Sequence, residues 1–329
     1  MSYRRALLIG LLITIVALAA GAEELILCGG DEVFVLNLPP PIERPPTKKW
    51  SWRARDCAEL PAYLREAFKT TDDCKPIDGG RTILITSSGG AVALVERKTG
   101  IALFYAAAIN AHSADILPGG RVAVASSVGK NGNRLILFDL KWPEKPLYSD
   151  PLVSAHGVVW DGDRDILWAL GGDELRAYRL VDWETDRPSL TQDAAFPLPG
   201  RGGHELSPVP GTPMLMITAG RRVYEFHRET RTFRVYPDLD GRESIKSISI
   251  HPLTGQVAYT MSGSEGWWTD RVRFLHPEND LVLPGERLYK ARWNCTLHPP
   301  ASAKGRVIGS ILPKTGDAPS VSSRQSENP

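Results

Sequence analysis

The chain has 329 residues, of which 39 are Lys or Arg and 38 are Asp or Glu, so its formal charge at pH 7 is +1. Apolar residues make up 42% and charged residues 23%, an ordinary globular composition that excludes disorder along the whole length. A near-neutral chain without clusters of basic residues also lacks the positive footprint that nucleic-acid binding requires. The 30 Gly and 26 Pro favour many short strands joined by turns.

Residues 1–22 have the pattern of a secretory signal peptide. Arg4 and Arg5 precede an apolar run from Ala6 to Ala20, and small residues then form an A-x-A cleavage pattern that ends at Ala22. The run is shorter than the about 20 apolar residues of a membrane-spanning helix, and an uncleaved anchor is the alternative interpretation. We therefore expect a secreted or periplasmic protein with no stable membrane insertion after the signal is cleaved.

Export would permit disulfide bonds among the four cysteines. The spacing favours a local pair between Cys57 and Cys74 and a second pair between Cys28 and Cys295, near the two chain ends. Free, buried thiols are the alternative. No CxxC spacing occurs, so a cysteine-based zinc site is not predicted.

From residue 25 onward the chain repeats a strand, a run of small residues and a second strand. Propeller blades of about 40–50 residues have this signature. The repeat therefore predicts an all-β fold, a six-bladed β-propeller over residues 23–300, with a seventh, degenerate blade as the alternative. The six copies are LILCGGDEVFVLNL from Leu25, TILITSSGGAVALV from Thr82, VAVASSVGKNGNRLILFDL from Val122, ILWALGGDELRAYRL from Ile166, MLMITAGRRVYEF from Met214 and VAYTMSGSEGWWTDRVRFL from Val257.

The chain ends indicate how such a ring closes. The first repeat lacks a preceding inner strand, whereas Tyr289–Asn294 is a strand candidate with no partner after it. We expect this last segment to complete the sheet begun by residues 24–55, giving a composite closing blade. Apolar residues at helical spacing predict a short inserted helix over residues 61–69, and the polar composition of residues 301–329 predicts a flexible tail.

When the repeats are aligned by their second strands, one position at the start of each innermost strand carries chemically active side chains. Because innermost strands line the central channel, an equal register means an equal height, so three imidazoles are expected to converge. Neutral imidazole is the commonest side-chain metal ligand, and the three predict a site for a divalent metal ion. The alternative is that the histidines bond to neighbouring backbone and brace the ring. The aligned residues are Asp72, His112, His156, His204 and, after one inserted residue, Lys246.

Further roles are predicted around this ring. Asp72 or Glu205 is a candidate proton acceptor or additional ligand, and Lys246, in a partly desolvated channel, is a candidate anion-binding group or base. Loops on the same face carry arginines that suit carboxylates and a tryptophan pair that suits a sugar ring. Solvated loop charges and an aromatic pair packed on its own blade are the alternative. These candidate substrate-binding residues are Arg221, Arg222, Trp267, Trp268 and Arg271.

The repeats AHSADILPGGRVAVASS, AHGVVWDGDRDILWALGG and GGHELSPVPGTPMLMITAG resemble an uncharacterised group of exported bacterial six-bladed propeller proteins. The resemblance spans nearly all of residues 25–295 and implies the fold and an envelope or extracellular setting, with no established reaction. More loosely, histidines holding a metal at a propeller's centre are similar to the layout of oligogalacturonate lyases. That second likeness is architectural only, because propellers host many unrelated functions.

These observations predict an exported propeller that binds a divalent metal ion in its channel and acts on a carbohydrate or a small acidic molecule, by lyase-type elimination of an acidic sugar. The alternative is a non-catalytic propeller of the cell envelope that binds a glycan or a protein. No GxSxG, P-loop or HExxH motif points to another chemistry.

Overall fold

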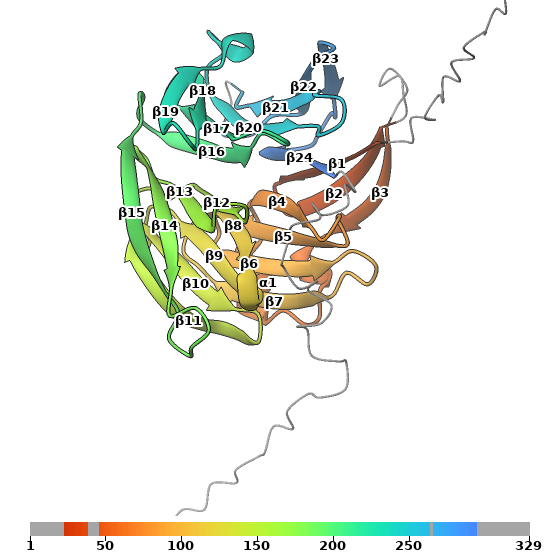
Figure 1. Cartoon of the computed structure of the whole chain (residues 1–329). Coiled ribbons are helices and arrows are strands. Elements are labelled where there is room, and N and C mark those ends of the chain that lie inside the picture. Colours follow the sequence, from red (N-terminus) through yellow and green to blue (C-terminus); the bar gives the residue numbers. More distant parts are fainter. Residues whose placement is uncertain (1–22, 39–45, 264–265, 295–329) are drawn as a thin grey trace, which may run out of the picture.

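A computed structural model describes residues 23–38, 46–263 and 266–294 and contains six antiparallel sheets of four strands each. Figure 1 shows the sheets arranged around a common centre. The predicted six-bladed propeller is therefore confirmed, and the described residues form no seventh blade. The predicted signal peptide, the predicted tail and Cys295 lie outside the described residues. Within the part of the chain that is described, no helix is long and apolar enough to cross a membrane.

We number the blades I to VI in chain order. Blade I contains β24 (Lys290–Asn294), β1 (Glu23–Gly29), β2 (Glu32–Leu38) and β3 (Thr47–Trp52). Blade II contains β4 (Thr71–Ile77), β5 (Thr82–Ser87), β6 (Ala91–Glu96) and β7 (Ala102–Ala107). Blade III contains β8 (Ala111–Leu117), β9 (Arg121–Ser126), β10 (Arg134–Asp139) and β11 (Trp142–Pro151).

The remaining blades follow the same order. Blade IV contains β12 (Gly157–Asp161), β13 (Ile166–Leu170), β14 (Glu174–Val181) and β15 (Ser189–Pro197). Blade V contains β16 (Gly203–Pro208), β17 (Met214–Ala219), β18 (Arg222–His227) and β19 (Thr232–Val235). Blade VI contains β20 (Ile245–Ile250), β21 (Val257–Met261), β22 (Arg271–Leu275) and β23 (Asn279–Val282).

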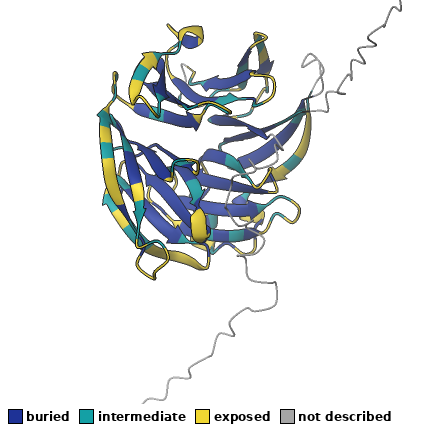
Figure 2. Cartoon of the chain, in the orientation of Figure 1, coloured by how far each residue is buried: buried dark blue, intermediate teal, exposed yellow. Residues whose placement is uncertain are grey.

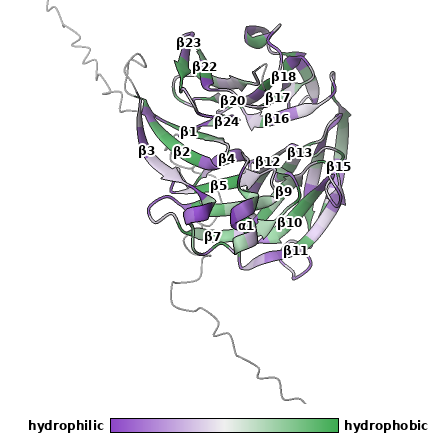
Figure 3. Ribbon diagram, turned by 180° about the vertical axis from the view of Figure 1, so that it is seen from behind, coloured by the Kyte–Doolittle hydropathy of each residue, from purple (hydrophilic) through white to green (hydrophobic). Residues whose placement is uncertain are grey.

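Burial decreases from the inner to the outer strands of a blade. Every residue of β5, β9 and β17 is buried, because each sheet packs on both faces against its neighbours. The fourth strands β11 and β15 are largely exposed, and Figure 2 shows this change along the blades. Figure 3 shows apolar residues along middle strands such as β2 and β10. The hydrophobic core is thus divided among the seams between blades.

The ring is closed by strand pairing between the two ends of the described chain. β24 pairs antiparallel with β1, with Trp293 opposite Leu25 and Lys290 opposite Cys28. Each first strand also contacts the first strand of the next blade, and β24 contacts both β20 and β4, which completes the circle. The predicted composite blade is therefore confirmed.

The predicted inserted helix is present as α1 (Ala62–Ala67), which starts directly after Pro61. Leu64 and Phe68 are buried under blades I and II, and the Phe68 ring meets Trp52 edge-on with 5.4 Å between ring centroids. Three single 3-10 turns, η1 (Ala54–Asp56), η2 (Pro118–Gly120) and η3 (Pro237–Leu239), are the other described helical segments.

Cys28, Cys57 and Cys74 are free and buried. The predicted pair between Cys57 and Cys74 is therefore wrong. The Cys57 thiol donates a hydrogen bond to Glu59 within the η1–α1 connection, while the Cys74 thiol donates to the Ile26 carbonyl on β1.

Candidate functional site

The first strands of four blades share an irregularity at the same position. In β8, Ala111 pairs with Ser126 and Ser113 pairs with Ala125, so His112 is left without an opposite residue. Such a bulge redirects a side chain and lets consecutive residues point the same way. The bulge residues are Asp72 in β4, His112 in β8, His204 in β16 and Lys246 in β20.

Two further residues occupy the equivalent position in the other blades. His156 directly precedes β12, and its backbone N–H donates to the Leu170 carbonyl at 2.8 Å. Tyr289 directly precedes β24, and its N–H donates to the Cys28 carbonyl at 2.7 Å. The register thus defines an upper ring of one residue from each blade: Tyr289, Asp72, His112, His156, His204 and Lys246.

Tyr289 was not among the predicted site residues. The signal for it was available, because the strand candidate that predicted the composite blade begins at this residue. Aligning that strand with the other five first strands would have placed Tyr289 in the register of the histidines.

The three predicted histidines do lie together. The rings of His112 and His156 are stacked, with 4.3 Å between centroids and an angle of 12° between planes. The ring of His204 meets His156 edge-on, at 4.8 Å and 84°. Tyr289 lies on the other side of His112, with its centroid 6.2 Å away. The expected convergence of the imidazoles is present, and their chemical roles remain predictions.

The protonation of His156 follows from its contacts. Its Nδ1 lies 2.8 Å from the Ser154 carbonyl oxygen, which can only accept, so Nδ1 carries the proton and Nε2 carries the lone pair. Burial, together with the neighbouring His112 and His204, lowers the pKa of His156 well below its usual range. His156 is therefore a neutral imidazole at pH 7.

The two other histidines differ in their partners. Nδ1 of His112 lies 3.0 Å from Oδ1 of Asp72, and the backbone N–H of Ser88 donates to the other oxygen of that carboxylate. Among the described residues, neither Nδ1 makes a hydrogen bond of good geometry, and the buried Nδ1 of His204 has no ion-pair partner either. Burial and the charge of Lys246 lower the pKa of His204 to about 3, so this ring is also neutral at pH 7.

The arrangement of the rings limits what they can hold jointly. An imidazole nitrogen directs its lone pair in the plane of the ring, so one ion cannot lie in line with both of two parallel, stacked rings. His112 and His156 are stacked in this way, and one of them would have to turn to share an ion with the other. Within residues 23–38, 46–263 and 266–294, no three His, Cys, Asp or Glu side chains are grouped so as to hold a metal ion.

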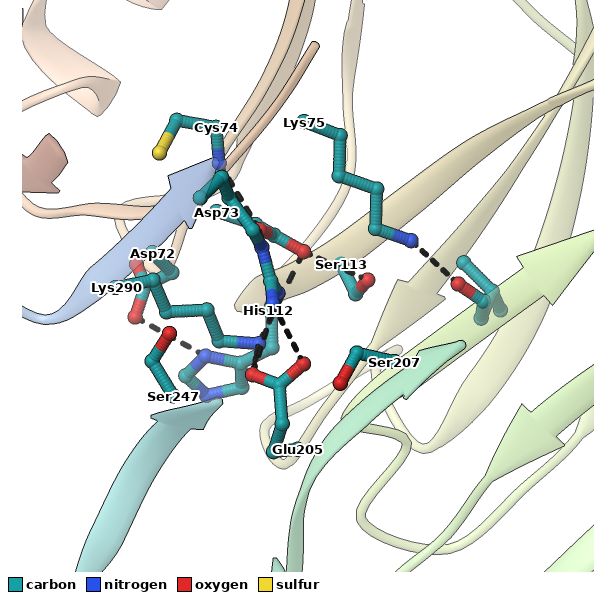
Figure 4. Close-up of polar contacts among 12 residues, drawn as sticks. Asp72, Asp73, Cys74, Lys75, His112, Ser113, Glu205, Ser207, Ser247 and Lys290 are labelled. Carbon is teal, nitrogen blue, oxygen red and sulfur yellow. Dashed lines mark hydrogen bonds and ion pairs between the residues drawn. The ribbon is translucent and has the colours of Figure 1, made fainter. Parts of the chain in front are cut away.

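Beneath the upper ring lies a buried charged layer formed by Asp73, Glu205, Lys290 and Arg292. The Arg292 guanidinium donates to both Glu205 oxygens at 2.8 and 3.2 Å and to Asp73 at 2.9 Å. Figure 4 shows the Lys290 ammonium directed at Glu205, with Nζ and Oε2 3.1 Å apart. Although burial raises it, the charges of Arg292 and Lys290 hold the pKa of Asp73 below its usual range.

The charged layer bears on the predicted role of Glu205 as a proton acceptor or metal ligand. Glu205 is fully buried and its carboxylate is neutralised by two cations, so it is not available as a metal ligand or proton acceptor in this arrangement. Asp72, one layer higher, is paired with His112 instead. Of the two carboxylates proposed from the sequence, Asp72 is the one that belongs to the upper ring.

A pocket of about 250 Å³ opens beside the upper ring between blades V and VI. Four cationic side chains and one indole line it, and within the described part of the chain no carboxylate does. The Lys246 ammonium lies 4.9 Å from the centre of the Trp267 ring, a cation–π contact. Burial lowers the pKa of Lys246 to about 8. We call this the cationic pocket; the side chains that decide its chemistry are Arg201, His204, Arg222, Arg242, Lys246 and Trp267.

Only part of the predicted substrate-binding set reaches the cationic pocket. Arg222 and Trp267 line it, whereas Arg221, Trp268 and Arg271 do not. Arg221 is exposed and lies 3.5 Å from Glu243, and Arg271 is paired with Asp280 at 2.9 Å. The Trp268 ring lies under the Arg287 guanidinium, 4.8 Å away. Arg201 and Arg242 were missed, because they lie in blade-to-blade connections that the repeat pattern does not align.

The opposite end of the channel forms a separate cavity of about 400 Å³. Each blade contributes at least one inner-strand residue to its lining, which includes the tryptophans Trp160 and Trp293. The buried charged layer separates this lower cavity from the cationic pocket. The inner-strand residues of the lining include Lys75, Asp115, Val159, Ser207, Ser249 and Arg292, one from each blade.

Comparisons with known proteins agree with the fold. A family model described as "Family of unknown function (DUF6528)" matches residues 45–301. Among solved structures, the chain is similar to one titled "Crystal structure of Nidogen/Laminin Complex", with a TM-score of 0.55 and 14% sequence identity over 84% of this chain and 100% of that chain. At this identity the similarity shows the propeller fold alone. No curated protein matches the chain.

Proposed function

Because the chain belongs to the DUF6528 family of unknown function, we propose its activity from the site: an exported propeller that binds an acidic carbohydrate at the mouth of its channel. The fold itself is compatible with a binding propeller. Export is proposed from the N-terminal sequence pattern, and the ligand class from the cationic pocket.

One observation carries the proposal. Lys246 is only 4% exposed, and among the described residues its ammonium has the Trp267 ring as a partner and no carboxylate. A buried cation without a counter-ion is costly, and an anionic ligand group would offset that cost. The lowered pKa of Lys246 is consistent with this unmet demand for a negative charge.

The arginines suit a carboxylate in particular. Arg222 and Arg242 present planar guanidinium groups, which bind carboxylates through two parallel hydrogen bonds. Their present partners, Asp240 at 3.4 Å and Glu278 at 2.9 Å, are substantially exposed, so exchanging them for a ligand carboxylate costs little.

The remaining surfaces suit the rest of a sugar. Trp267 is 66% exposed beside the cationic pocket and offers a flat apolar face for a pyranose ring. Next to it, the neutral imidazoles of His204 and His156 supply hydrogen-bonding groups without charge, which suits hydroxyl groups. Together these features select a ligand that carries both a carboxylate and hydroxyls, as uronic acids do.

Isothermal titration calorimetry with matched oligosaccharides tests the proposal. We expect trigalacturonate to bind and the neutral trisaccharide of galactose to bind at least about 30-fold more weakly, the difference that an unpaired buried charge produces. Lys246→Met should remove most of that preference, whereas Lys98→Met on the exposed rim of blade II should keep it. Equal affinity for the charged and neutral sugars would overturn the proposal.

Catalysis is a second candidate, favoured by the contact between Asp72 and His112 and by the free Nε2 of the neutral His156. In an elimination, a base removes the proton from the carbon next to the carboxylate. A carbon–carbon double bond then forms and the glycosidic oxygen leaves with the bonding electrons. A neutral imidazole can take that proton. New ultraviolet absorbance from the unsaturated product, lost in His156→Ala, would support this candidate.

A divalent metal ion at the histidines remains a separate proposal. Nδ1 of His156 faces a carbonyl and Nδ1 of His112 lies beside the Asp72 carboxylate. Nδ1 of His204 has neither kind of partner among the described residues, so it best fits a ligand role. Titration of purified protein with Mn²⁺ or Zn²⁺ tests it. Stoichiometric binding that is lost in His204→Ala would support a metal site, and no saturable binding would contradict it.

A further inference from the structure

Two buried cysteines lie at the seam between blade I, the composite blade that closes the ring, and blade II. Cys28 lies on β1 of blade I and Cys74 on β4 of blade II, and neither has any solvent exposure. Both belong to the same hydrophobic cluster, which fills the seam between these blades.

The backbone holds the two strands together at this point. The Thr71 N–H donates to the Gly30 carbonyl at 2.7 Å, and the Gly29 N–H donates to the Thr71 hydroxyl at 2.8 Å. Cys74 Sγ lies 3.7 Å from the Ile26 carbonyl, two residues from Cys28 along β1. Cys28 and Cys74 also lie in the same buried cluster, on strands β1 and β4, which contact each other. The fold therefore brings the two cysteines together at this seam.

We propose that Cys28 and Cys74 form a disulfide bond when the chain folds in an oxidising environment. The co-reactant is a small disulfide such as oxidised glutathione. The two cysteine thiols are oxidised and a sulfur–sulfur bond forms between them. The bond within glutathione disulfide breaks, and the two protons and two electrons leave on two molecules of reduced glutathione.

The cross-link would act on the closure of the ring. Blade I contains both the first and the last described strands, and noncovalent contacts, the Arg292–Asp73 ion pair among them, hold it against blade II. A covalent bond from β1 to β4 would join this composite blade to blade II and restrict the unfolded chain. An exported protein would gain this bond, whereas the same chain in a reducing compartment would lack it.

Because both thiols are buried in the folded protein, the stage of folding affects when the disulfide bond can form. Burial raises the pKa of the Cys28 thiol well above its usual range, and contact with Cys74 adds to the effect, so the reactive thiolate is scarce in the folded state. Folded, reduced protein should therefore react slowly, and the bond should form while the blades assemble.

Oxidative refolding followed by peptide mapping tests the proposal. The full-length protein with its four cysteines is unfolded, reduced, and refolded with a mixture of reduced and oxidised glutathione. Free thiols are then alkylated before digestion without reductant. We expect a peptide cross-linked between Cys28 and Cys74, with Cys57 alkylated. Alkylation of Cys28 and Cys74 in the refolded protein, or linkage of either to Cys57 or Cys295, would overturn the proposal.

Thermal unfolding provides a second readout. The oxidised protein should melt several degrees above its reduced form, and Cys57→Ser should preserve this difference. The double variant C28A/C74A, which keeps the seam apolar, should melt at the same temperature in both conditions. An equal redox shift in C28A/C74A would show that these two cysteines are not the source of the stabilisation.

Discussion

The carboxylate of Asp73 and the guanidinium of Arg292 lie 2.9 Å apart although 219 residues separate them in the sequence. Asp73 belongs to the first strand of blade II, and Arg292 belongs to the last strand of the ring. Arg292 also reaches Glu205 on blade V, so one guanidinium connects three blades across the channel. This contact links the closure of the propeller to the base of the candidate site.

Replacing Arg292 with Met should destabilise the protein by about 3–5 kcal/mol, because two buried carboxylates lose their main partner. Urea unfolding monitored by circular dichroism would measure the change. The matched control is Arg271→Met, whose pair with Asp280 is of similar length but largely exposed and should cost about 1 kcal/mol or less. Equal losses in the two variants would show that the channel network has no special role.

The fold was largely predictable because short, local sequence patterns define each repeat. Strands, small-residue turns and the unpaired segment at Tyr289 were sufficient to predict six blades and a composite one. The common register also brought His112, His156 and His204 together correctly. Two kinds of site residue could not be predicted. Arg201 and Arg242 come from connections outside the repeat, and the partners of Glu205 lie on a strand far away in sequence. The Cys57–Cys74 pairing failed because sequence proximity does not fix thiol geometry.

The imidazoles of His156 and His204 should remain neutral throughout the range from pH 5 to 8. Burial depresses both pKa values, so the charged forms appear only in more acidic solution. Histidine ring spectra recorded by NMR during a pH titration would show this, with the Nδ1–H form assigned to His156. Midpoints near the ordinary histidine value for His156 and His204 would contradict the buried, neutral cluster.

Affinity for an acidic ligand should fall as the pH rises through about 8, where the Lys246 ammonium loses its proton. The anion binds the protonated, positively charged form of Lys246, which predominates below that pH. Above it, the affinity should fall by up to about tenfold per pH unit. The arginine side chains of the pocket are always cationic and His204 is neutral at pH 7 and above, so neither kind of group contributes to the slope. Trigalacturonate titrations at pH 7, 8 and 9 would measure the slope, and Lys246→Met should flatten it. If the pH dependence of affinity persists in this variant, a group other than Lys246 causes it.

Trp267 and Trp268 should differ although they are adjacent. Trp267→Ala should weaken sugar binding about 3- to 10-fold, because Trp267 lines the cationic pocket and its ring also faces Lys246. Trp268→Ala should change affinity less than about 2-fold, since its ring is covered by Arg287 outside the pocket. Calorimetry on both variants measures the two affinities. A larger loss of affinity in Trp268→Ala than in Trp267→Ala would show that the sugar binds outside the pocket.

A crystal structure of the protein with bound digalacturonate would test the central claim most directly. We predict that one ligand carboxylate lies within hydrogen-bonding distance of Lys246 and of Arg222 or Arg242, with a sugar ring against Trp267. Electron density for the ligand in the lower cavity at Trp160, or on the outer edge of a blade, would contradict it.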